Sequence, residues 1–317
     1  MAGQRVSRPS VDTATDGRNG NDFSDFQLSR FRRHLMAENR AADTRTDYIR
    51  SVERLAGYLK EQGMPLNPAS LTREHVEAFI VAILEQWQPA TAAFYFRSLQ
   101  QYFKWLVDEG EIKASPMARM KVPRVPEKLV PIPKDDAVAV LLKVCSGQDF
   151  DSRRDRAMIR VMADTGVRRG GLVSMTIEGL DLDERTVKVF TKPQQELLLP
   201  LGKQAARDID RYLAVRKRHP KGELPQLWIG RYGPMTGSGV YQMLRDRAKE
   251  AGIGHVHPHM FRHYFAHTMK VEGAQDEDIM RLGGWKSREM LAKYGKASAD
   301  ERARQVHRRL SPGDRLV

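Results

Sequence analysis

A run of prolines in the middle of the chain limits what it can fold into more than any other feature. Five residues between 116 and 133 are proline: Pro116, Pro123, Pro126, Pro131 and Pro133. Proline lacks a backbone N–H donor and clashes with the preceding helical turn, so prolines at this density exclude helix and favour extended backbone. With 317 residues, the chain suits two domains better than one. We therefore expect a proline-rich, basic linker over 116–133 between two folded domains.

Four helical patterns precede this linker, each with apolar residues three or four positions apart. One of them places Tyr48, Val52, Leu55 and Leu59 on a single face. The other three have these apolar members: Phe23, Phe26, Phe31 and Leu35; Val76, Phe79, Ile80, Ile83 and Leu84; Phe96, Leu99, Phe103 and Leu106. Four helices with short loops predict a small all-α domain over 22–115. Residues 1–21 are polar and almost free of large apolar groups, which predicts a flexible tail.

The chain beyond the linker is predicted to be mainly helical with one short β-hairpin. The helical patterns cover these segments: 134–145, 152–164, 203–218, 238–251, 258–271, 275–282 and 298–310. Residues 186–190 and 197–201 are instead rich in apolar and β-branched side chains and flank a polar turn over 191–196. We expect an α+β domain over 134–317 with a small antiparallel sheet, and a mainly α protein as a whole.

The charge of the chain predicts a polyanionic partner. There are 53 Lys and Arg residues against 40 Asp and Glu, a formal net charge of +13. Residues 1–125 hold 18 basic and 15 acidic side chains, and residues 126–317 hold 35 and 25, so the main anion contact should lie in the second domain. The single Cys145 excludes an internal disulfide, and no segment resembles a membrane helix or a secretory signal. These features predict an intracellular protein that binds nucleic acid.

The segment that opens at Pro258 carries residue types suited to phosphate chemistry. His259, Arg262 and His263 lie at positions i, i+3 and i+4 of one predicted helix and therefore share a face. Arginine offers a planar fork of donors to phosphate oxygens, histidine exchanges a proton near neutral pH, and a helix N-terminus attracts anions. Ordinary surface residues on a helix would show the same spacing, so this pattern alone leaves both interpretations open.

The histidines around this segment fit a metal site poorly. His255, His257, His259, His263 and His267 are close in sequence, and two of the intervals are i, i+4. Zinc needs three or four converging ligands, and the sequence has neither the glutamate of an HExxH motif nor a CxxC pair. We therefore expect no metal and no other cofactor.

Four further positions are ambiguous when each is taken alone. Arg168 follows Gly166, a predicted left-handed helix stop, and Lys192 lies in the predicted hairpin turn. Trp285 and Tyr294 belong to a short segment near the C-terminus. An arginine at a helix end, a solvated lysine in a turn and partly buried aromatic residues would account for them equally well.

Taken together, these positions resemble the tyrosine recombinase family, which includes the phage integrases and the Xer-type recombinases. The TGVR sequence ending at Arg168 matches the family's first arginine box, and HMFR, from His259 to Arg262, matches its HxxR box. Trp285 follows 23 residues after Arg262, and Tyr294 follows nine residues later, which is the family's spacing without a gap. The resemblance spans roughly residues 23–310 and implies an N-terminal SAM-like core-binding domain before a catalytic domain.

The resemblance implies a mechanism and a set of partners. The implied catalytic residues are Arg168, Lys192, His259, Arg262, Trp285 and Tyr294. Tyr294 would attack a DNA phosphodiester and form a 3′-phosphotyrosyl link without metal or ATP. A homotetramer on two DNA duplexes, with or without a second recombinase or accessory protein, would then exchange strands through a Holliday junction. The implied task is DNA integration, excision or resolution. It would take place in the cytoplasm, at a bacterial nucleoid or on the DNA of a phage or mobile element.

The sequence departs from the family's pattern at two points. The position three residues after Arg168 is usually acidic in the family, but here it is Gly171. The hairpin turn usually carries more basic residues than 191–196 does, although Lys192 is present. Two alternatives therefore stay open: a type IB topoisomerase-like enzyme with the same nucleophile, and a DNA-binding protein of this fold with impaired catalysis.

Overall fold

The computed structural model describes residues 23, 25–126, 133, 135–192, 195–295 and 299–315. The chain divides into two compact units, Met1–Glu127 and Lys128–Val317, each with its own buried apolar core. The division falls within the proline-rich segment, whose described residues 116–126 contain neither helix nor strand. The predicted tail over 1–21 lies outside the described residues, as does most of the predicted linker beyond residue 126.

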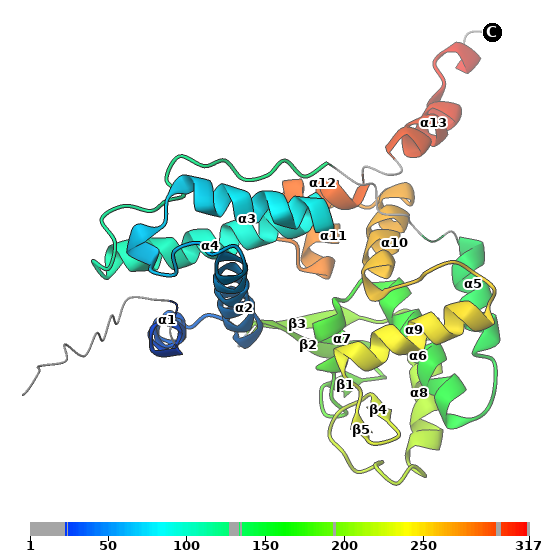
Figure 1. Ribbon diagram of the computed structural model, residues 1–317. Helices are drawn as coiled ribbons and strands as arrows, with labels where there is room; N and C mark the ends of the chain where they lie inside the picture. The colour runs from blue at the N-terminus through cyan, green and yellow to red at the C-terminus, as the bar shows by residue number, and fades with distance from the viewer. Residues whose placement is uncertain are drawn as a thin grey trace, which may run out of the picture. The chain divides into compact units, whose positions relative to one another are not determined.

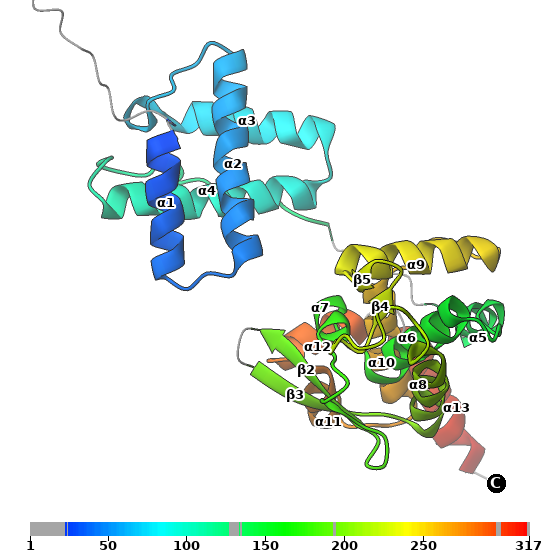
Figure 2. The same ribbon diagram turned by 90° about the horizontal axis from the view of Figure 1, so that it is seen from below.

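The first unit consists of α-helices, as its four apolar patterns predict (Figures 1 and 2). They are α1 (Asp25–Ala37), α2 (Ala42–Glu61), α3 (Arg73–Gln86) and α4 (Pro89–Asp108), with the short 3-10 helix η1 (Pro68–Ser70) before α3. α2 and α4 stop just before Gly63 and Gly110, whose φ angles of +63° and +73° glycine adopts without strain. The inward faces of α2, α3 and α4 meet in a core that includes Leu55, Phe79 and Phe103.

The second unit combines helices with a small sheet (Figure 1). Its helices are α5 (Asp135–Val144), α6 (Phe150–Thr165), α7 (Arg169–Val173), α8 (Lys203–Arg216), α9 (Gly237–Glu250), α10 (Pro258–Val271), α11 (Asp276–Gly283), α12 (Arg288–Gly295), α13 (Ala299–Leu310) and the 3-10 helix η3 (Gly313–Arg315). Most of them match the predicted segments to within a few residues. Five-residue α7 is too short for a periodic pattern and was not predicted. None of the described helices is long and apolar enough to cross a membrane.

The sheet is larger than the predicted hairpin. Strands β1 (Leu180–Asp181), β2 (Thr186–Lys192) and β3 (Gln195–Pro200) form an antiparallel sheet in that order. β2 runs past the predicted end of the strand and pairs Lys192 with Gln195, with a shift of register after Phe190. The predicted turn over 191–196 is therefore too wide, because backbone ladder bonds continue where side chains turn polar. A second pair, β4 (Ile229–Gly230) and β5 (Gly233–Pro234), was also not predicted.

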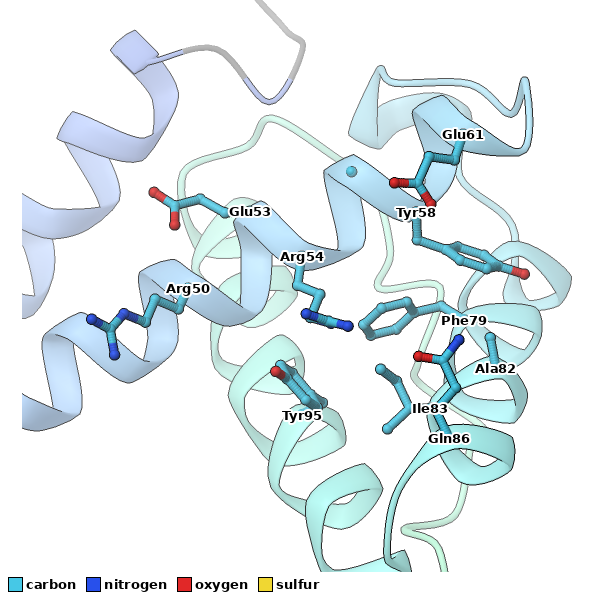
Figure 3. A pocket seen from close by; sticks show the side chains of 11 residues that line it. Arg50, Glu53, Arg54, Tyr58, Glu61, Phe79, Ala82, Ile83, Gln86 and Tyr95 are labelled. Atoms are coloured by element: carbon cyan, nitrogen blue, oxygen red, sulfur yellow. The ribbon is translucent and has the colours of Figure 1, made fainter.

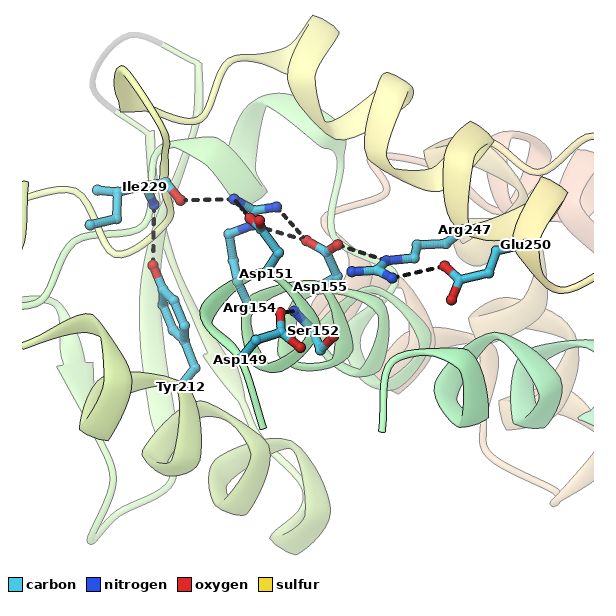
Figure 4. Close-up of polar contacts among 9 residues, drawn as sticks. All are labelled: Asp149, Asp151, Ser152, Arg154, Asp155, Tyr212, Ile229, Arg247 and Glu250. Carbon is cyan, nitrogen blue, oxygen red and sulfur yellow. Dashed lines mark hydrogen bonds and ion pairs between the residues drawn. The ribbon is translucent and has the colours of Figure 1, made fainter. Parts of the chain in front are cut away.

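A buried ion network fastens α6 to its surroundings in the second unit (Figure 4). Asp155 of α6 accepts hydrogen bonds from Arg154 at 2.7 and 2.9 Å and from Nε of Arg247 in α9 at 2.9 Å. Arg154 also reaches the Ile229 carbonyl at 3.4 Å, next to the backbone N–H that donates to Tyr212. α6 is thereby fixed relative to α8, α9 and the second strand pair. The first arginine of the candidate site, Arg168, follows the C-terminal end of α6 as the N-cap residue of α7.

Candidate active site

The corner between α6 and α7 determines where Arg168 lies. α6 ends at Gly166, whose φ of +60° belongs to the left-handed region that glycine adopts without strain. A Cβ atom on Gly166 would lie 2.7 Å from the Phe265 side chain, so packing also requires glycine here. Arg168 follows in extended conformation as the N-cap residue of α7. The predicted helix stop at Gly166 is thus confirmed, and it aims the chain toward α10.

Arg262 is buried on α10 and is held by two backbone carbonyls. Its side chain is 1% exposed. Nη1 donates to the Gly166 carbonyl at 2.8 Å, and Nη2 donates to the Gly283 carbonyl at 2.6 Å. These carbonyls terminate α6 and α11, so the guanidinium joins two helix ends that are distant in sequence. A planar fork of donors suits this arrangement better than the single point charge of a lysine would.

Arg168 uses the carbonyl next to the one that holds Arg262. Its Nη1 and Nη2 lie 3.5 and 3.4 Å from the Gly284 carbonyl oxygen. Carbonyls at the C-terminal end of a helix carry partial negative charge, which favours a nearby cation. The two guanidinium groups are therefore brought together by backbone dipoles at the end of α11.

The Trp285 ring covers Arg262. The guanidinium carbon of Arg262 lies 3.7 Å from the centroid of the Trp285 ring, and the ring stacks on Phe265 at 6.4 Å with an interplanar angle of 6°. A Cβ atom on Gly283 would lie 1.8 Å from the same ring. Trp285 is 5% exposed, so it acts on the site by packing over Arg262. Gly283 is what lets the ring lie against the chain.

Arg168, His259 and Arg262 line one pocket of about 410 Å³. The pocket is also lined by residues from α7, α9 and the segment before α10: Val167, Arg169, Gly170, Tyr241, His257 and Pro258. Three of the six predicted catalytic residues therefore converge on one pocket although they come from positions almost a hundred residues apart. The N-terminus of α10 begins at this pocket with Pro258, which suits the first helical turn.

Two histidines of α10, His259 and His263, are held toward their neutral forms. Partial burial and the nearby positive charges of Arg262, His257 and Arg168 lower the pKa of His259. Burial, with the neighbouring His259, lowers the pKa of His263 to about 4. The His259 and His263 rings meet edge to face at 5.0 Å. Near neutral pH, His259 is therefore an imidazole that can accept a proton. Within the described residues, no three His, Cys, Asp or Glu side chains gather as a metal site requires.

Two predicted catalytic residues are placed by their backbone alone. Lys192 is the last residue of β2, and Tyr294 belongs to α12. Their side chains lie outside the part of the chain that the structure describes. The grouping of Arg168, His259 and Arg262, with Trp285 packed over Arg262, is accordingly the observed part of the predicted site.

Gly171, one of the departures from the family pattern, lies in a closely packed place. A Cβ atom on Gly171 would lie 3.0 Å from the Val167 side chain and 3.7 Å from Val189, because α7 packs closely on β2. A side chain at this position would therefore require the Val167 side chain to shift by a few tenths of an ångström. The Gly284 carbonyl lies against the Arg168 guanidinium instead, and it supplies negative partial charge to it.

The residues that hold the arginines were not predicted from sequence. Gly283 and Gly284 act through their backbone carbonyls, which leave no side-chain signal in the sequence. Tyr241 and His257 line the pocket as well. For His257 the sequence does offer a signal, because it lies two residues before the predicted catalytic His259.

A larger hollow of about 560 Å³ lies in the first unit, between α2, α3 and α4 (Figure 3). Arg54 points into it from α2, near Phe79 and Tyr95. Its guanidinium carbon lies 4.1 Å from the centroid of the Trp87 ring. This hollow is lined by none of the predicted catalytic residues, three of which line the smaller pocket of the second unit.

Known proteins with similar sequences cover both units. A family model described as the phage integrase family matches residues 133–301, and one described as the phage integrase N-terminal SAM-like domain matches residues 28–111. The chain is 31% identical over 263 residues to tyrosine recombinase XerC of Salmonella typhi, which covers 82% of this chain and 87% of that protein. It is 27% identical over 256 residues to tyrosine recombinase XerD of Listeria innocua serovar 6a, covering 79% and 86%.

The fold is also similar to that of solved structures. A crystal structure of the XerH site-specific recombinase bound to a palindromic difH substrate aligns with a TM-score of 0.71. The alignment covers 92% of this chain and 85% of that chain at 15% sequence identity. At this sequence identity the similarity shows the fold alone. In this chain the first unit is all helical, and the second combines helices with small antiparallel sheets.

Proposed function

The chain belongs to the phage integrase family of tyrosine recombinases, and on that premise we propose that it cleaves and rejoins DNA at specific sites through a covalent link to Tyr294. One observation carries the proposal above all. Arg168, His259 and Arg262 converge on a single pocket at the N-terminus of α10. That pocket combines two fixed cations with a neutral imidazole, which is the combination that phosphoryl transfer from DNA to a phenol requires.

The two arginines stabilise the reacting phosphate. Negative charge builds on its non-bridging oxygens as the nucleophile approaches, and donors already fixed in place stabilise that charge without reorganising. Arg262 is fixed by the Gly166 and Gly283 carbonyls and by the ring of Trp285. Arg168 lies against the Gly284 carbonyl beside it. Trp285 contributes by holding Arg262 in position.

Tyr294 supplies the nucleophile, and His259 accepts its proton. A phenol, with an ordinary pKa of about 10, is mostly protonated at neutral pH and needs a base nearby. The lowered pKa of His259 keeps the imidazole free to accept that proton. The phenolate oxygen bonds to phosphorus while the bond to the 5′ oxygen breaks, leaving a 3′-phosphotyrosyl link. Lys192 donates the proton that the departing 5′ oxygen takes up.

The covalent link allows the strand to be passed to a partner. Phosphotyrosine retains the energy of the cleaved phosphodiester, so a 5′-hydroxyl from a second duplex reverses the step without ATP. We assign to this chain a homotetramer on two double-stranded recombination sites, which exchanges strands in pairs through a Holliday junction. The similar XerH structure is described as bound to its DNA substrate, which supports duplex DNA as the partner. We propose that the protein acts on DNA in the cytoplasm.

A paired assay tests the proposal. A preferred DNA site is first selected from a randomised duplex library by binding to the full chain. A plasmid with two copies of that site should then recombine, whereas a plasmid without the site should keep its supercoils. Relaxation of any supercoiled plasmid without recombination would identify the topoisomerase-like alternative. Binding without either reaction would identify the catalytically impaired one.

A further inference from the structure

Tyr241 brings an uncharged donor to the wall of the active-site pocket. It projects from α9 and lines the pocket together with Arg168, His259 and Arg262. Its side chain is 37% exposed, so it lies open to a substrate. The family pattern gives this position no catalytic role, and the mechanism above does not use it.

The Tyr241 side chain is fixed by a contact with a different segment. Its hydroxyl lies 2.9 Å from Nε2 of His255, which belongs to the segment between α9 and α10. The two rings lie 5.6 Å apart, and the His255 ring lies 5.6 Å from that of His257, which also lines the pocket. The Tyr241 hydroxyl is therefore held at a defined place beside the pocket.

An exposed tyrosine–histidine pair often does no more than connect two surface segments. Two features, the size of the pocket and the chemistry of the hydroxyl, indicate that Tyr241 can also contact a ligand. The pocket, at about 410 Å³, falls in the size range of roughly 300–1,000 Å³ that is typical of sites for whole small-molecule ligands, so it has room for more than one phosphate group. A tyrosine hydroxyl can also accept one hydrogen bond while it donates another. In the tautomer of His255 that carries its proton on Nε2, the imidazole donates to the Tyr241 oxygen, and the hydroxyl proton can then be donated to a phosphate.

The charge of the pocket favours a neutral donor at this place. Arg168 and Arg262 already supply two positive charges, and the exposed Arg169 also lines the pocket. Burial, together with the positive charges of Arg262, His257 and Arg168, lowers the pKa of His259. The same charges would repel a further cation at this place. A phenol hydroxyl adds a directed contact to a phosphate oxygen without that repulsion.

We propose that Tyr241 is a further DNA-binding residue of the active site, which donates a hydrogen bond to a phosphate that flanks the cleaved one. His255 is its positioning residue: with DNA bound, Nε2–H donates to the phenol oxygen and turns the hydroxyl proton toward the phosphate. The inference rests on the proposed function, because it takes the pocket to hold the DNA backbone. It adds to that function a contact that fixes the register of the strand at the site of cleavage.

A cycle of protein and DNA changes tests the contact. The selected duplex is prepared with a single uncharged methylphosphonate at each successive position around the cleaved bond, and its binding to the full chain is measured. Tyr241→Phe, which keeps the ring and loses only the hydroxyl, should bind unmodified duplex about tenfold more weakly, as expected for a hydrogen bond to a charged group. At one flanking methylphosphonate position, wild type and Tyr241→Phe should bind equally.

Two further variants separate the contact from a structural effect. Tyr232→Phe is the matched control, because Tyr232 is 86% exposed and is not among the residues that line the pocket; it should bind every duplex like wild type. His255→Ala should weaken binding, but it should have no further effect when Tyr241 is already Phe.

The proposal is overturned if Tyr241→Phe binds the unmodified duplex as well as wild type does. It is also overturned if the loss is the same at every methylphosphonate position, since a structural defect would not depend on one phosphate. Binding can be measured whether or not the DNA is cleaved. Failure of the proposed function would show instead as the absence of recombination on the selected site, while this cycle would still give its own answer.

Discussion

At the scale of single residues, the site depends on glycines as much as on charged groups. Gly166 and Gly283 each provide a carbonyl to Arg262, and each is closely approached by an aromatic side chain, Phe265 in one case and Trp285 in the other. These aromatic rings stack on each other beneath the guanidinium. The position of the Arg262 guanidinium thus depends on two residues that have no side chain, Gly166 and Gly283.

Gly283→Ala should destabilise the second unit and displace Trp285 from Arg262. The new Cβ atom would lie 1.8 Å from the indole ring, and overpacking of this kind costs about 1–3 kcal/mol. Urea unfolding of the full chain, followed by tryptophan fluorescence, measures the change. Gly170→Ala is the control, because no atom lies within 4 Å of its Cβ position, and it should stay within about 0.5 kcal/mol of wild type. Equal effects of the two substitutions would contradict this account of Gly283.

His263 should make the fold less stable in acid. Burial lowers its pKa to about 4 from an ordinary value of 6.5, so between these values the unfolded chain binds the proton more readily than the folded one. The contribution of His263 is therefore complete above pH 6.5 and is lost as the pH falls toward 4. Between pH 7.5 and 5.5, wild type should lose roughly 1 kcal/mol more than His263→Gln. Parallel stability curves for the two proteins over this range would contradict the assignment.

At the scale of elements, α6 and α10 are the two helices that bring the site together. Both could be predicted from sequence, since their apolar periodicity is clear and Gly166 and Pro258 mark a stop and a start. α7, β1 and the β4–β5 pair could not, because elements of two to five residues are too short to show a period. The β2–β3 hairpin could be predicted, but its turn was predicted too long, because the backbone hydrogen bonds between the strands continue through polar residues as far as Lys192 and Gln195.

Asp155→Asn should loosen α6 from α9. The carboxylate of Asp155 pairs with Arg154 and Arg247, and all three groups are largely screened from water (Figure 4). Arg154 and Arg247 would each keep a second carboxylate, Asp151 and Glu250, but both of these are more than half exposed. The loss of the one buried charge between them should therefore cost about 3 kcal/mol. Asp246→Asn is the control: its pair with Arg245 is exposed and 3.7 Å long, so the cost should be about 0–1 kcal/mol. Thermal unfolding of the full chain compares the two, and a small effect at Asp155 would argue against its role in fixing α6.

At the scale of the whole molecule, the proline-rich segment and the excess of positive charge were the informative features. The division after Glu127 falls in that segment, where extended backbone is favoured by composition alone. The candidate site was predictable as a set of residue types at family spacing, and three of its members do share one pocket. The carbonyls that hold the arginines were not predictable, because backbone groups look alike in every sequence.

Most of the positive charge excess is expected to bind DNA without regard to its sequence, and few of the 53 basic residues are expected to take part in cleavage. Arg262→Ala should therefore abolish cleavage while changing the salt dependence of binding only slightly. The slope of log K against log salt falls by about 0.9 for each phosphate contact removed, so the loss of Arg262 should lower it by about one. Filter binding at several salt concentrations measures the slope. A collapse of binding in parallel with cleavage would make Arg262 a docking residue instead.

The central claim is that Tyr294 becomes covalently joined to DNA. A duplex of the selected site with a nick next to the cleaved bond traps the intermediate, because the short 5′-hydroxyl fragment diffuses away before it can reverse the reaction. Denaturing gel electrophoresis should show a protein–DNA adduct for wild type and none for Tyr294→Phe, while both proteins bind the duplex with similar affinity. An adduct that persists in Tyr294→Phe would contradict the account.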